Sequence, residues 1–419
     1  MEQNTGRSRT KKEKKYLKVT SAQITLMVVI SLFIGAVLSI LVLAGRTTRF
    51  RIADVESKYD ASLISELLEE IDKYYYFSED APDSQKLREA AAKSVVEAIG
   101  DRYAAYYTDE EYADFRNQMN GNYKGIGVLV SPSDDGKGML VTRSYENNNA
   151  YNAGVRDGDI IVKIDGKSLE KLSFDESADL IIGEDGTKVK LEILRDGKKL
   201  EFEVERGDVH TTQVFSRQLE DNIGYICIES FTGDAATAFN EHLDKLLGAG
   251  IKSLIIDIRN NPGGSLDIVV AIADRVLPDC LITTIEGRLC NPPEEYKSSD
   301  EQKLEIPYVV LVNGNSASAS EVFSSAVQDN KQAKIIGTTT FGKGIVQTSW
   351  SLGNGMGFIK LTTDAYRTPS GRLIHGIGVV PDIEVEQDAQ LEGVDPYFIM
   401  RDAMERDLQL KAAVDELTK

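Results

Sequence analysis

The spacing of apolar residues changes twice along the chain, and each change predicts a different kind of structure. Between residues 50 and 118, apolar side chains recur every three to four positions, which predicts helices. The clearest of these spans Ser62–Tyr74, and another covers Ala90–Ile99. From about residue 121 the period becomes two, with Asp-Gly turns between short runs, which predicts strands. One helix, over Ser173–Ile182, interrupts them.

Beyond about residue 222 the apolar runs become continuous and alternate with helical patterns. Ile251–Ile258 and Tyr308–Val312 carry almost no polar residue, which is typical of strands that are buried on both faces of an α/β core. Pro396–Leu417 predicts one acidic amphipathic helix. The chain is therefore predicted to be a multidomain protein that combines α/β and α+β parts.

One uncharged run near the N-terminus predicts a membrane-spanning helix. Ile24–Ala44 is 21 residues long, which is enough to cross a bilayer. The lysines and arginines before it predict a cytoplasmic N-terminus, with everything after Arg46 outside the membrane. The alternative is a cleaved signal peptide with Val42-Leu43-Ala44 as its cleavage site, although the apolar region of such peptides is usually about 7–15 residues. Cleavage is left open.

The charge of the chain argues against nucleic acid as a partner. The formal net charge is −19, although residues 1–20 carry +5, so the rest of the chain carries −24. A surface this acidic repels a phosphate backbone. The three cysteines are too few for a disulfide scaffold. Cys227 is predicted to lie in the core, and a disulfide between Cys280 and Cys290 is left open.

A serine cluster is the first candidate for chemistry. The run from Ser316 to Glu321 (Ser-Ala-Ser-Ala-Ser-Glu) follows a predicted strand and turn and precedes an apolar helix. A nucleophile at such a helix start has backbone N–H groups and the helix dipole nearby to bind an oxyanion. The alternative is a capping box, Ser318-x-x-Glu321, with no catalytic role. Spacing alone does not choose among Ser316, Ser318 and Ser320.

Lys343 is the candidate base, because none of the three histidines lies in a recognisable triad pattern. A lysine acts as a base only if its surroundings depress its pKa by roughly 2–3 from about 10.4. Gly342 and Gly344 let the backbone around it turn sharply. One alternative is a solvated lysine in a glycine turn. A nucleotide-binding loop is the other, but Gly344 stands where that motif needs a hydroxyl, and a predicted strand follows instead of a helix.

Two glycine turns complete the set of candidates. Gly263-Gly264 follows a buried strand, and its backbone N–H groups suit half of an oxyanion hole, although a plain Pro-Gly turn explains the same residues. Gly125-Ile126-Gly127-Val128 opens the β-rich unit. Its N–H groups suit a peptide's terminal carboxylate, while the strand edge pairs with the peptide backbone.

Taken together, these elements resemble the C-terminal processing (tail-specific) serine peptidases that carry a PDZ domain. The resemblance covers about residues 50–385, although 50–118 matches only loosely. It rests on three motifs, which are Asn313-Gly-Asn-Ser-Ala-Ser-Ala-Ser-Glu321, Thr340-Phe-Gly-Lys-Gly-Ile-Val-Gln347, and Tyr366-Arg-Thr-Pro369-Ser-Gly371-Arg with the later Gly376-Ile-Gly-Val-Val-Pro381-Asp382. His375 departs from the family pattern, which has a polar residue such as glutamine there.

The resemblance assigns roles that spacing could not. It implies that Ser318 is the nucleophile, Lys343 its base, and Gln347 the residue that orients the lysine amine. It places Ala319 with Gly263 and Gly264 in the oxyanion hole. Ser316 and Ser320 then return to capping, and Asp329 becomes a supporting residue.

The prediction for the whole chain is a membrane-anchored, extracytoplasmic serine endopeptidase that cleaves proteins near their C-termini without metal or other cofactor. Its PDZ-like unit is expected to bind the substrate tail and to gate the site, and homodimer contacts are expected in the flanking helices. The alternative is a non-catalytic peptide-binding scaffold, and the sequence names no substrate. The predicted divisions are a cytoplasmic tail (1–21), an anchor (22–45), a helical region (46–120), a PDZ-like domain (121–206), a peptidase core (207–388) and a C-terminal helical region (389–419).

Overall fold

The computed structural model describes residues 62–77, 83–133, 136–211, 213–299, 301 and 303–419. The predicted membrane-spanning run, Ile24–Ala44, lies outside these residues. No helix among the residues described is both long enough and apolar enough to cross a membrane. The chain divides into two compact units, Met1–Asp83 and Ser84–Lys419, which are described separately.

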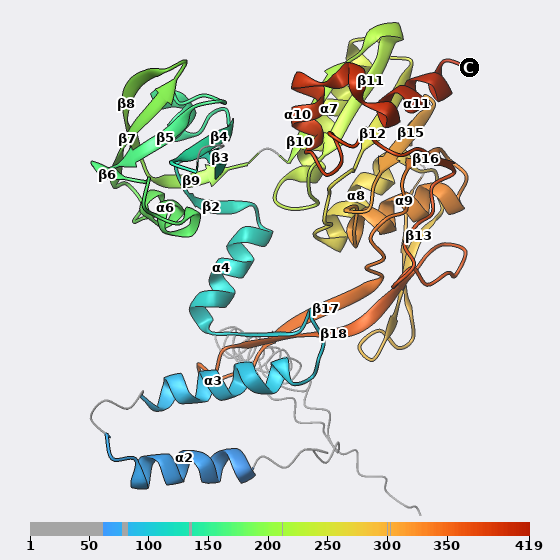
Figure 1. Cartoon of the computed structure of the whole chain (residues 1–419). Helices are drawn as coiled ribbons and strands as arrows, with labels where there is room; N and C mark the ends of the chain where they lie inside the picture. The colour runs from blue at the N-terminus through green and yellow to red at the C-terminus, as the bar shows by residue number, and fades with distance from the viewer. Residues whose placement is uncertain (1–61, 78–82, 134–135, 212, 300, 302) are drawn as a thin grey trace, which may run out of the picture. The chain divides into compact units, whose positions relative to one another are not determined.

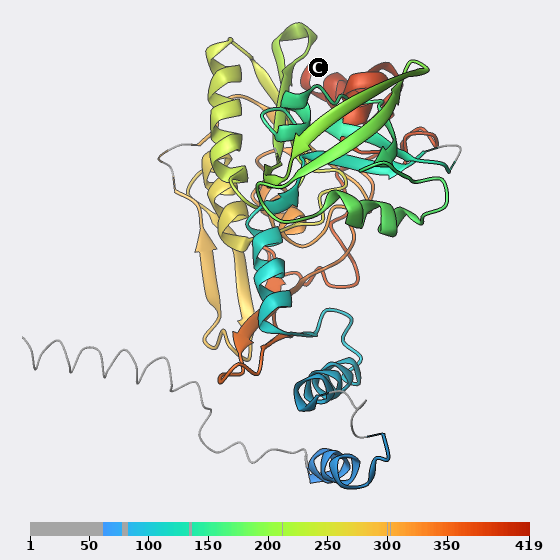
Figure 2. The same ribbon diagram turned by 90° about the vertical axis from the view of Figure 1, so that its left-hand side faces the viewer.

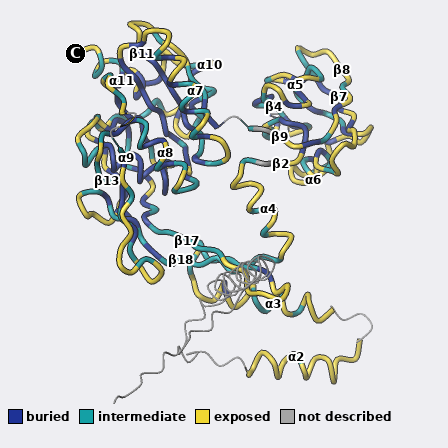
Figure 3. Tube along the Cα trace, turned by 180° about the vertical axis from the view of Figure 1, so that it is seen from behind, coloured by how far each residue is buried: buried dark blue, intermediate teal, exposed yellow. Residues whose placement is uncertain are grey.

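The first unit contributes one described helix, α2 (Ser62–Tyr74), which confirms the predicted helix with the same bounds. Its apolar face is exposed, as the yellow trace in Figure 3 shows. Leu63, Leu67 and Ile71 are 62%, 50% and 40% exposed, so the apolar face of this helix is largely open to solvent.

The second unit begins with two helices and a short strand. Thr108 and Glu111 form a capping box that starts the second of these helices. The prediction that 50–118 is purely helical was wrong. The three residues Ala105–Tyr107 lie between the two helices and form a strand that pairs with a distant part of the chain. The elements are α3 (Ser84–Glu97), β1 (Ala105–Tyr107) and α4 (Asp109–Met119).

The β-rich unit is an antiparallel sheet with a helix beside it. Val189, Leu191 and Ile193 point into its core while their neighbours face outward, as the period of two predicts. The strand order is β3-β4-β5-β7-β8, with β6 beside β5. The elements are β3 (Val128–Pro132), β4 (Met139–Ser144), α5 (Asn149–Ala153), β5 (Ile160–Ile164), β6 (Lys167–Ser168), α6 (Phe174–Ile181), β7 (Lys188–Arg195) and β8 (Lys198–Glu205), with β2 (Asn122–Gly125) paired to β9 (Gly207–His210) outside this sheet.

The core sheet has the order β10-β11-β12-β15-β16-β19 and is parallel except for β10. Both of its faces are covered, which explains the continuous apolar runs. Along β12, for example, Ile256 packs against helices on one face and Ile255 against helices on the other. The strands are β10 (Val214–Gln218), β11 (Ile223–Ile228), β12 (Ser253–Asp257), β15 (Tyr308–Val312), β16 (Lys334–Gly337) and β19 (Ile383–Glu384).

Helices cover the two faces of this sheet (Figures 1 and 2). On one face lie α7 (Ala235–Gly248), α8 (Leu266–Val276) and α9 (Ala319–Asp329). On the other lie α10 (Pro396–Asp402) and α11 (Leu408–Leu417), so the prediction of one continuous helix from Pro396 to Leu417 was wrong. The break occurs where Asp407 caps the N-terminus of α11 with its own side chain.

A third sheet carries the candidate glutamine on an edge strand, and the candidate lysine lies in the loop just before that strand. Its order is β1-β18-β13-β14, with β17 also paired to β18. Its remaining strands are β13 (Leu281–Gly287), β14 (Glu294–Lys297), β17 (Ile345–Ser351) and β18 (Phe358–Arg367). Cys227 is buried in the core as predicted, and no disulfide joins Cys280 to Cys290.

Candidate active site

Ser318 occupies a sharp turn between β15 and α9, and its backbone is strained. Its φ of 57° and ψ of −112° place a non-glycine residue at positive φ, outside the regions that L-residues favour. Such strain persists only where surrounding contacts enforce it, and it concentrates at functional sites. A strained serine between a strand and a helix is also the geometry of a nucleophile elbow, which exposes the hydroxyl above the sheet.

The contact that enforces this backbone is the buried carboxylate of Glu321. It accepts the N–H of Ser318 at 2.9 Å, and it accepts the N–H of Gly342 and of Lys343 at 2.7 Å each. The hydroxyl of Thr340 donates to it at 2.6 Å. The carboxylate therefore does more than cap a helix, because it joins the serine turn to the lysine loop.

Lys343 is half-buried in a positively charged setting. Burial, followed by the charges of Lys360 and Arg102, lowers the pKa of Lys343, while Glu321 opposes the shift. The ammonium lies 4.8 Å from the centre of the Tyr103 ring. That ring contact favours the charged amine, whereas burial and the two neighbouring positive charges favour the neutral amine that a base requires.

The catalytic hydrogen bonds expected of the three residues are not formed within the described part of the chain. There, no hydrogen bond joins the Lys343 amine to Ser318 or to Gln347. The Gln347 amide donates to Thr362 at 3.3 Å instead. The Ser318 side chain shares a hydrogen bond with Tyr366, whose pKa is raised by burial to about 12. The structure thus brings the serine and lysine loops together without engaging the two side chains.

The double-glycine turn (Asn260–Gly264) lies directly against Ser318. A Cβ on Gly263 would come within 2.8 Å of Ser318 Cβ and 3.0 Å of the Ala319 nitrogen, so no larger residue fits. The N–H of Gly263 already donates to Asn261 Oδ1 at 2.8 Å. Among the described residues, the N–H groups of Gly264 and Ala319 have no protein acceptor. Of the three predicted oxyanion donors, these two are therefore available to a ligand.

The two remaining serines of the cluster hold this turn in place. Ser316 donates its hydroxyl to Ile258 O at 2.8 Å, and Ser320 donates to Asn261 O at 2.8 Å. The expectation that they serve as caps was wrong, because their partners lie about sixty residues earlier in the chain. The Ser320 contact fixes the serine turn to the double-glycine turn, and the Ser316 contact fixes it to the residue that follows β12.

Asp329 supports a different turn, as expected. It accepts the N–H and the hydroxyl of Ser370 at 3.0 and 2.7 Å and pairs with Arg372. Although burial opposes ionisation, these bonds and one from Thr368 keep the pKa of Asp329 below its ordinary value. Asp329 therefore stabilises the loop that follows β18.

The predicted peptide-binding residues line an apolar groove in the β-rich unit. Gly125, Ile126, Gly127 and Val128 border a cavity of about 410 Å³. Other lining residues come from β3, α6 and the core, and they include Val130, Ile181, Ile182 and Glu229. The groove is therefore closed on one side by the peptidase core.

Glu229 also forms the contact between this unit and the core that sequence reasoning missed. It forms an ion pair with Arg143 of β4, whose guanidinium lies 4.0 Å from the centre of the Tyr397 ring. Burial raises the pKa of Glu229 from 4.5 to about 7, against the opposing charge of Arg143. The two partners are 86 residues apart, so no local pattern marks them.

Comparison with known proteins agrees with this arrangement. Residues 222–385 match peptidase family S41, and residues 140–195 match the PDZ domain. A carboxy-terminal-processing protease of Bartonella bacilliformis (strain ATCC 35685 / KC583 / Herrer 020/F12,63) is 36% identical over 313 residues, which are 73% of this chain and 71% of the relative.

A CtpA-like serine protease of Staphylococcus haemolyticus (strain JCSC1435) is 35% identical over 314 residues. These are 74% of this chain, but they span only 62% of the length of that relative. Among solved structures, a protein of Bacteroides fragilis NCTC 9343 described as an S41 protease aligns with a TM-score of 0.55 and 15% identity. The alignment covers 83% of this chain and 96% of that one, and at this identity it supports the fold alone.

Proposed function

The chain belongs to peptidase family S41, and on that premise we propose that it is a serine endopeptidase that cleaves other proteins near their C-termini. The observation that carries the proposal is the strained backbone of Ser318, which Glu321 joins to the loop of Lys343. Strain of this kind is costly, and a helix cap alone would not require it. Non-catalytic peptide binding would also leave the lowered pKa of Lys343 without a use.

In the proposed reaction, Ser318 Oγ attacks the scissile carbonyl while the neutral amine of Lys343 takes the hydroxyl proton. The oxyanion accepts hydrogen bonds from the N–H groups of Ala319 and Gly264. The lysine then gives its proton to the leaving amine and activates the water that hydrolyses the acyl-enzyme. Gln347 orients the lysine amine once the substrate has brought the side chains together.

Substrate tails enter through the PDZ domain in this proposal. The groove beside Gly125–Val128 offers backbone N–H groups to a terminal carboxylate and an apolar wall to the last side chains. Glu229 of the core lines the same groove, so a tail bound there contacts both domains. Through this shared contact, binding of a tail to the PDZ domain would control cleavage in the core. The exposed apolar face of α2 is the proposed homodimer contact.

We also propose that Ile24–Ala44 anchors the protein in the cell membrane, with the catalytic part on the extracytoplasmic side. The support is the uncharged length of this run and the basic residues before it. The second candidate function is a membrane-anchored scaffold that binds tails without cleaving them.

The test is cleavage of an unfolded protein with an apolar C-terminus by the full chain in detergent, beside Ser318→Ala and Lys343→Ala. The peptidase is supported if the unmodified chain cleaves and both variants bind the tail but do not cleave. Tail binding without cleavage by the unmodified chain would support the scaffold.

A further inference from the structure

A buried ionic cluster lies directly behind the double-glycine turn. Arg259 follows the end of β12 and is the residue before that turn, and only 2% of its surface is exposed. Its Nε donates to both oxygens of Asp257 at 3.0 and 2.9 Å, and Asp257 also accepts the Tyr225 hydroxyl at 2.7 Å. Asp257 alone is therefore enough to balance the charge of the guanidinium.

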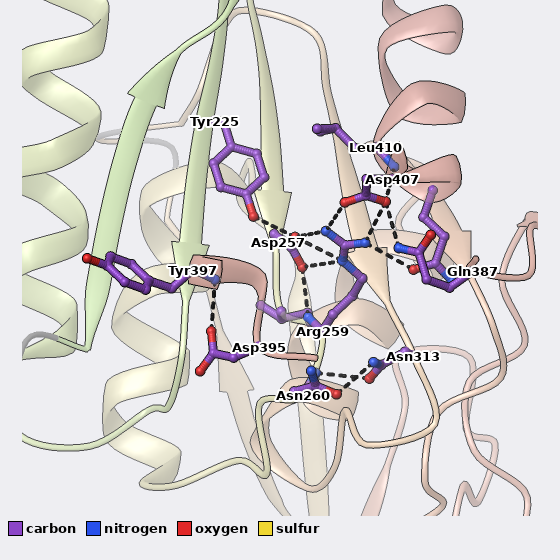
Figure 4. Close-up of polar contacts among 12 residues, drawn as sticks. Tyr225, Asp257, Arg259, Asn260, Asn313, Gln387, Asp395, Tyr397, Asp407 and Leu410 are labelled. Atoms are coloured by element: carbon purple, nitrogen blue, oxygen red, sulfur yellow. Dashed lines mark hydrogen bonds and ion pairs between the residues drawn. The ribbon is translucent and has the colours of Figure 1, made fainter. Parts of the chain in front are cut away.

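A second carboxylate nevertheless binds the same guanidinium from 148 residues further along the chain (Figure 4). Asp407 accepts from Arg259 Nη1 at 2.9 Å and from Nη2 at 2.8 Å, which is a bidentate pair. Gln409 accepts from Nη1 at 3.1 Å. Although burial opposes ionisation, the charge of Arg259 keeps the pKa of Asp407 below its ordinary value.

The same part of the chain holds the turn at a second point. The side-chain amide of Asn260 donates to Val394 O at 2.8 Å, and its N–H donates to Asn313 Oδ1 at 2.9 Å. Asn260 has a φ of 58°, a left-handed conformation that asparagine adopts more readily than most residues. Residues on both sides of α10 therefore fix the first residue of the double-glycine turn and the residue before it.

Docking of α11 does not explain this cluster. Met400, Leu410 and Ala413 already pack against the sheet, and apolar contact would hold the C-terminal helices without any charge. Burying a further carboxylate costs desolvation, so its benefit lies in fixing a geometry. The geometry that this cluster can fix is the direction of the Gly264 N–H. This direction matters because oxyanion donors must be held close to the position that the charge will occupy.

We propose that Asp407 is a positioning residue for the oxyanion site, acting through Arg259 on the double-glycine turn. The inference rests on the proposed peptidase function. Asp407 lies beyond residues 222–385, the region that matches the peptidase family, so this support comes from the C-terminal segment in addition to the contacts within the core.

The test compares Asp407→Asn with Asp388→Asn in the full chain. Asp388 is an acid of the same segment that pairs with Arg406 at the surface, so its substitution is the matched control. Each variant is assayed at temperatures where circular dichroism shows it folded. Three quantities are measured: kcat, KM, and the affinity for a peptide boronic acid, which forms a tetrahedral adduct with the serine.

For Asp407→Asn we expect kcat and the boronate affinity to fall together, by roughly ten- to a hundredfold, because the oxyanion donors are displaced. KM and binding of an uncleaved tail peptide should stay unchanged, and Asp388→Asn should behave as the unmodified chain. A merely structural role would lower the melting temperature while leaving kcat and the boronate affinity of the folded variant unchanged, and that result would overturn the proposal.

If Asp407→Asn does not fold, Gln409→Met decides the matter. It removes the neutral acceptor of Arg259 Nη1 and keeps Asp407, so a smaller loss in the same two quantities is expected, and no loss in either overturns the proposal. The peptidase function is tested separately by Ser318→Ala. If the unmodified chain shows no cleavage that depends on Ser318, the proposed function is wrong, and this inference, which rests on it, is wrong as well.

Discussion

The peptidase core and the PDZ domain both present backbone N–H groups from glycine turns, but the two turns are held in different ways. The core turn, Asn260–Gly264, is held by the side chains of Asn313 and Ser320 and follows directly on Arg259, which buried carboxylates bind. The PDZ turn, Gly125–Gly127, borders an open groove, and its domain meets the core through the pairs Arg143–Glu229 and Arg401–Asp157. The proposed reacting groups are thus held by buried contacts, while the PDZ domain is attached by one pair whose contribution depends on pH and another that salt weakens.

The largest expected effect comes from removing the base while keeping its charge. Lys343→Arg should lower kcat by about a thousandfold or more, because a guanidinium does not release a proton at accessible pH. In the unmodified chain, cleavage should rise with pH as Lys343 loses its proton, with a midpoint below the ordinary lysine value because its pKa is lowered. Tail binding by the PDZ domain, measured by fluorescence anisotropy, should be the same in both, and loss of tail binding in the variant would contradict the separation of the two regions.

Glu321→Gln should cause the largest loss of stability in this comparison. The carboxylate accepts four donors, whereas an amide offers one oxygen and turns an NH₂ group toward the remaining donors. We expect the free energy of unfolding to fall by about 3–5 kcal/mol, measured by urea denaturation. A loss no larger than that for Glu229→Gln would show that the two regions are held equally firmly.

The PDZ contact should carry its own pH dependence. The pKa of Glu229 is raised to about 7, so its folded form holds the proton more tightly than the unfolded chain does. This contribution is fully present below about pH 4.5 and is lost as the pH rises through 7, at most on the order of 3 kcal/mol. In Glu229→Gln this part of the pH dependence should disappear from urea denaturation curves, and its persistence would assign it to another group.

The smallest expected effect is at the second PDZ contact. Arg401 donates to Asp157 at 2.5 Å, but the two side chains are 40% and 26% exposed. Asp157→Asn should therefore cost about 0.5 kcal/mol or less, and the difference should vanish in 1 M salt. A loss above about 2 kcal/mol at high salt would mean that this pair holds the PDZ domain as firmly as the core holds its turn.

What the sequence predicted well was local. The bounds of α2 follow from its apolar spacing alone, and the serine and lysine loops could be named from motifs of a few residues. The contacts that the sequence did not reveal join distant segments, such as Ser320 with Asn261 and Arg143 with Glu229. Periodicity reports which face of an element is apolar, and it carries no information about which polar partner that element meets in the fold.

The two C-terminal helices show the same limit. The apolar spacing predicted one amphipathic helix over Pro396–Leu417, and the structure places Met400 and Leu410 of this segment in the core. The spacing could not predict the break at Asp407, because this residue looks like any other acid on an exposed face until Arg259 is seen behind it. The sequence thus identifies Asp407 only as a charged residue, and only the structure identifies its partner.

The separation between Arg259 and Asp407 also has a consequence for biosynthesis. A chain is made from its N-terminus, and its earlier parts begin to fold while later ones are still being added. Ser318, Lys343 and the double-glycine turn are all synthesised before the carboxylate that completes the support of that turn. A nascent chain that stops between residues 343 and 407 therefore carries the proposed nucleophile and base without this last contact, so the site is completed only late in synthesis.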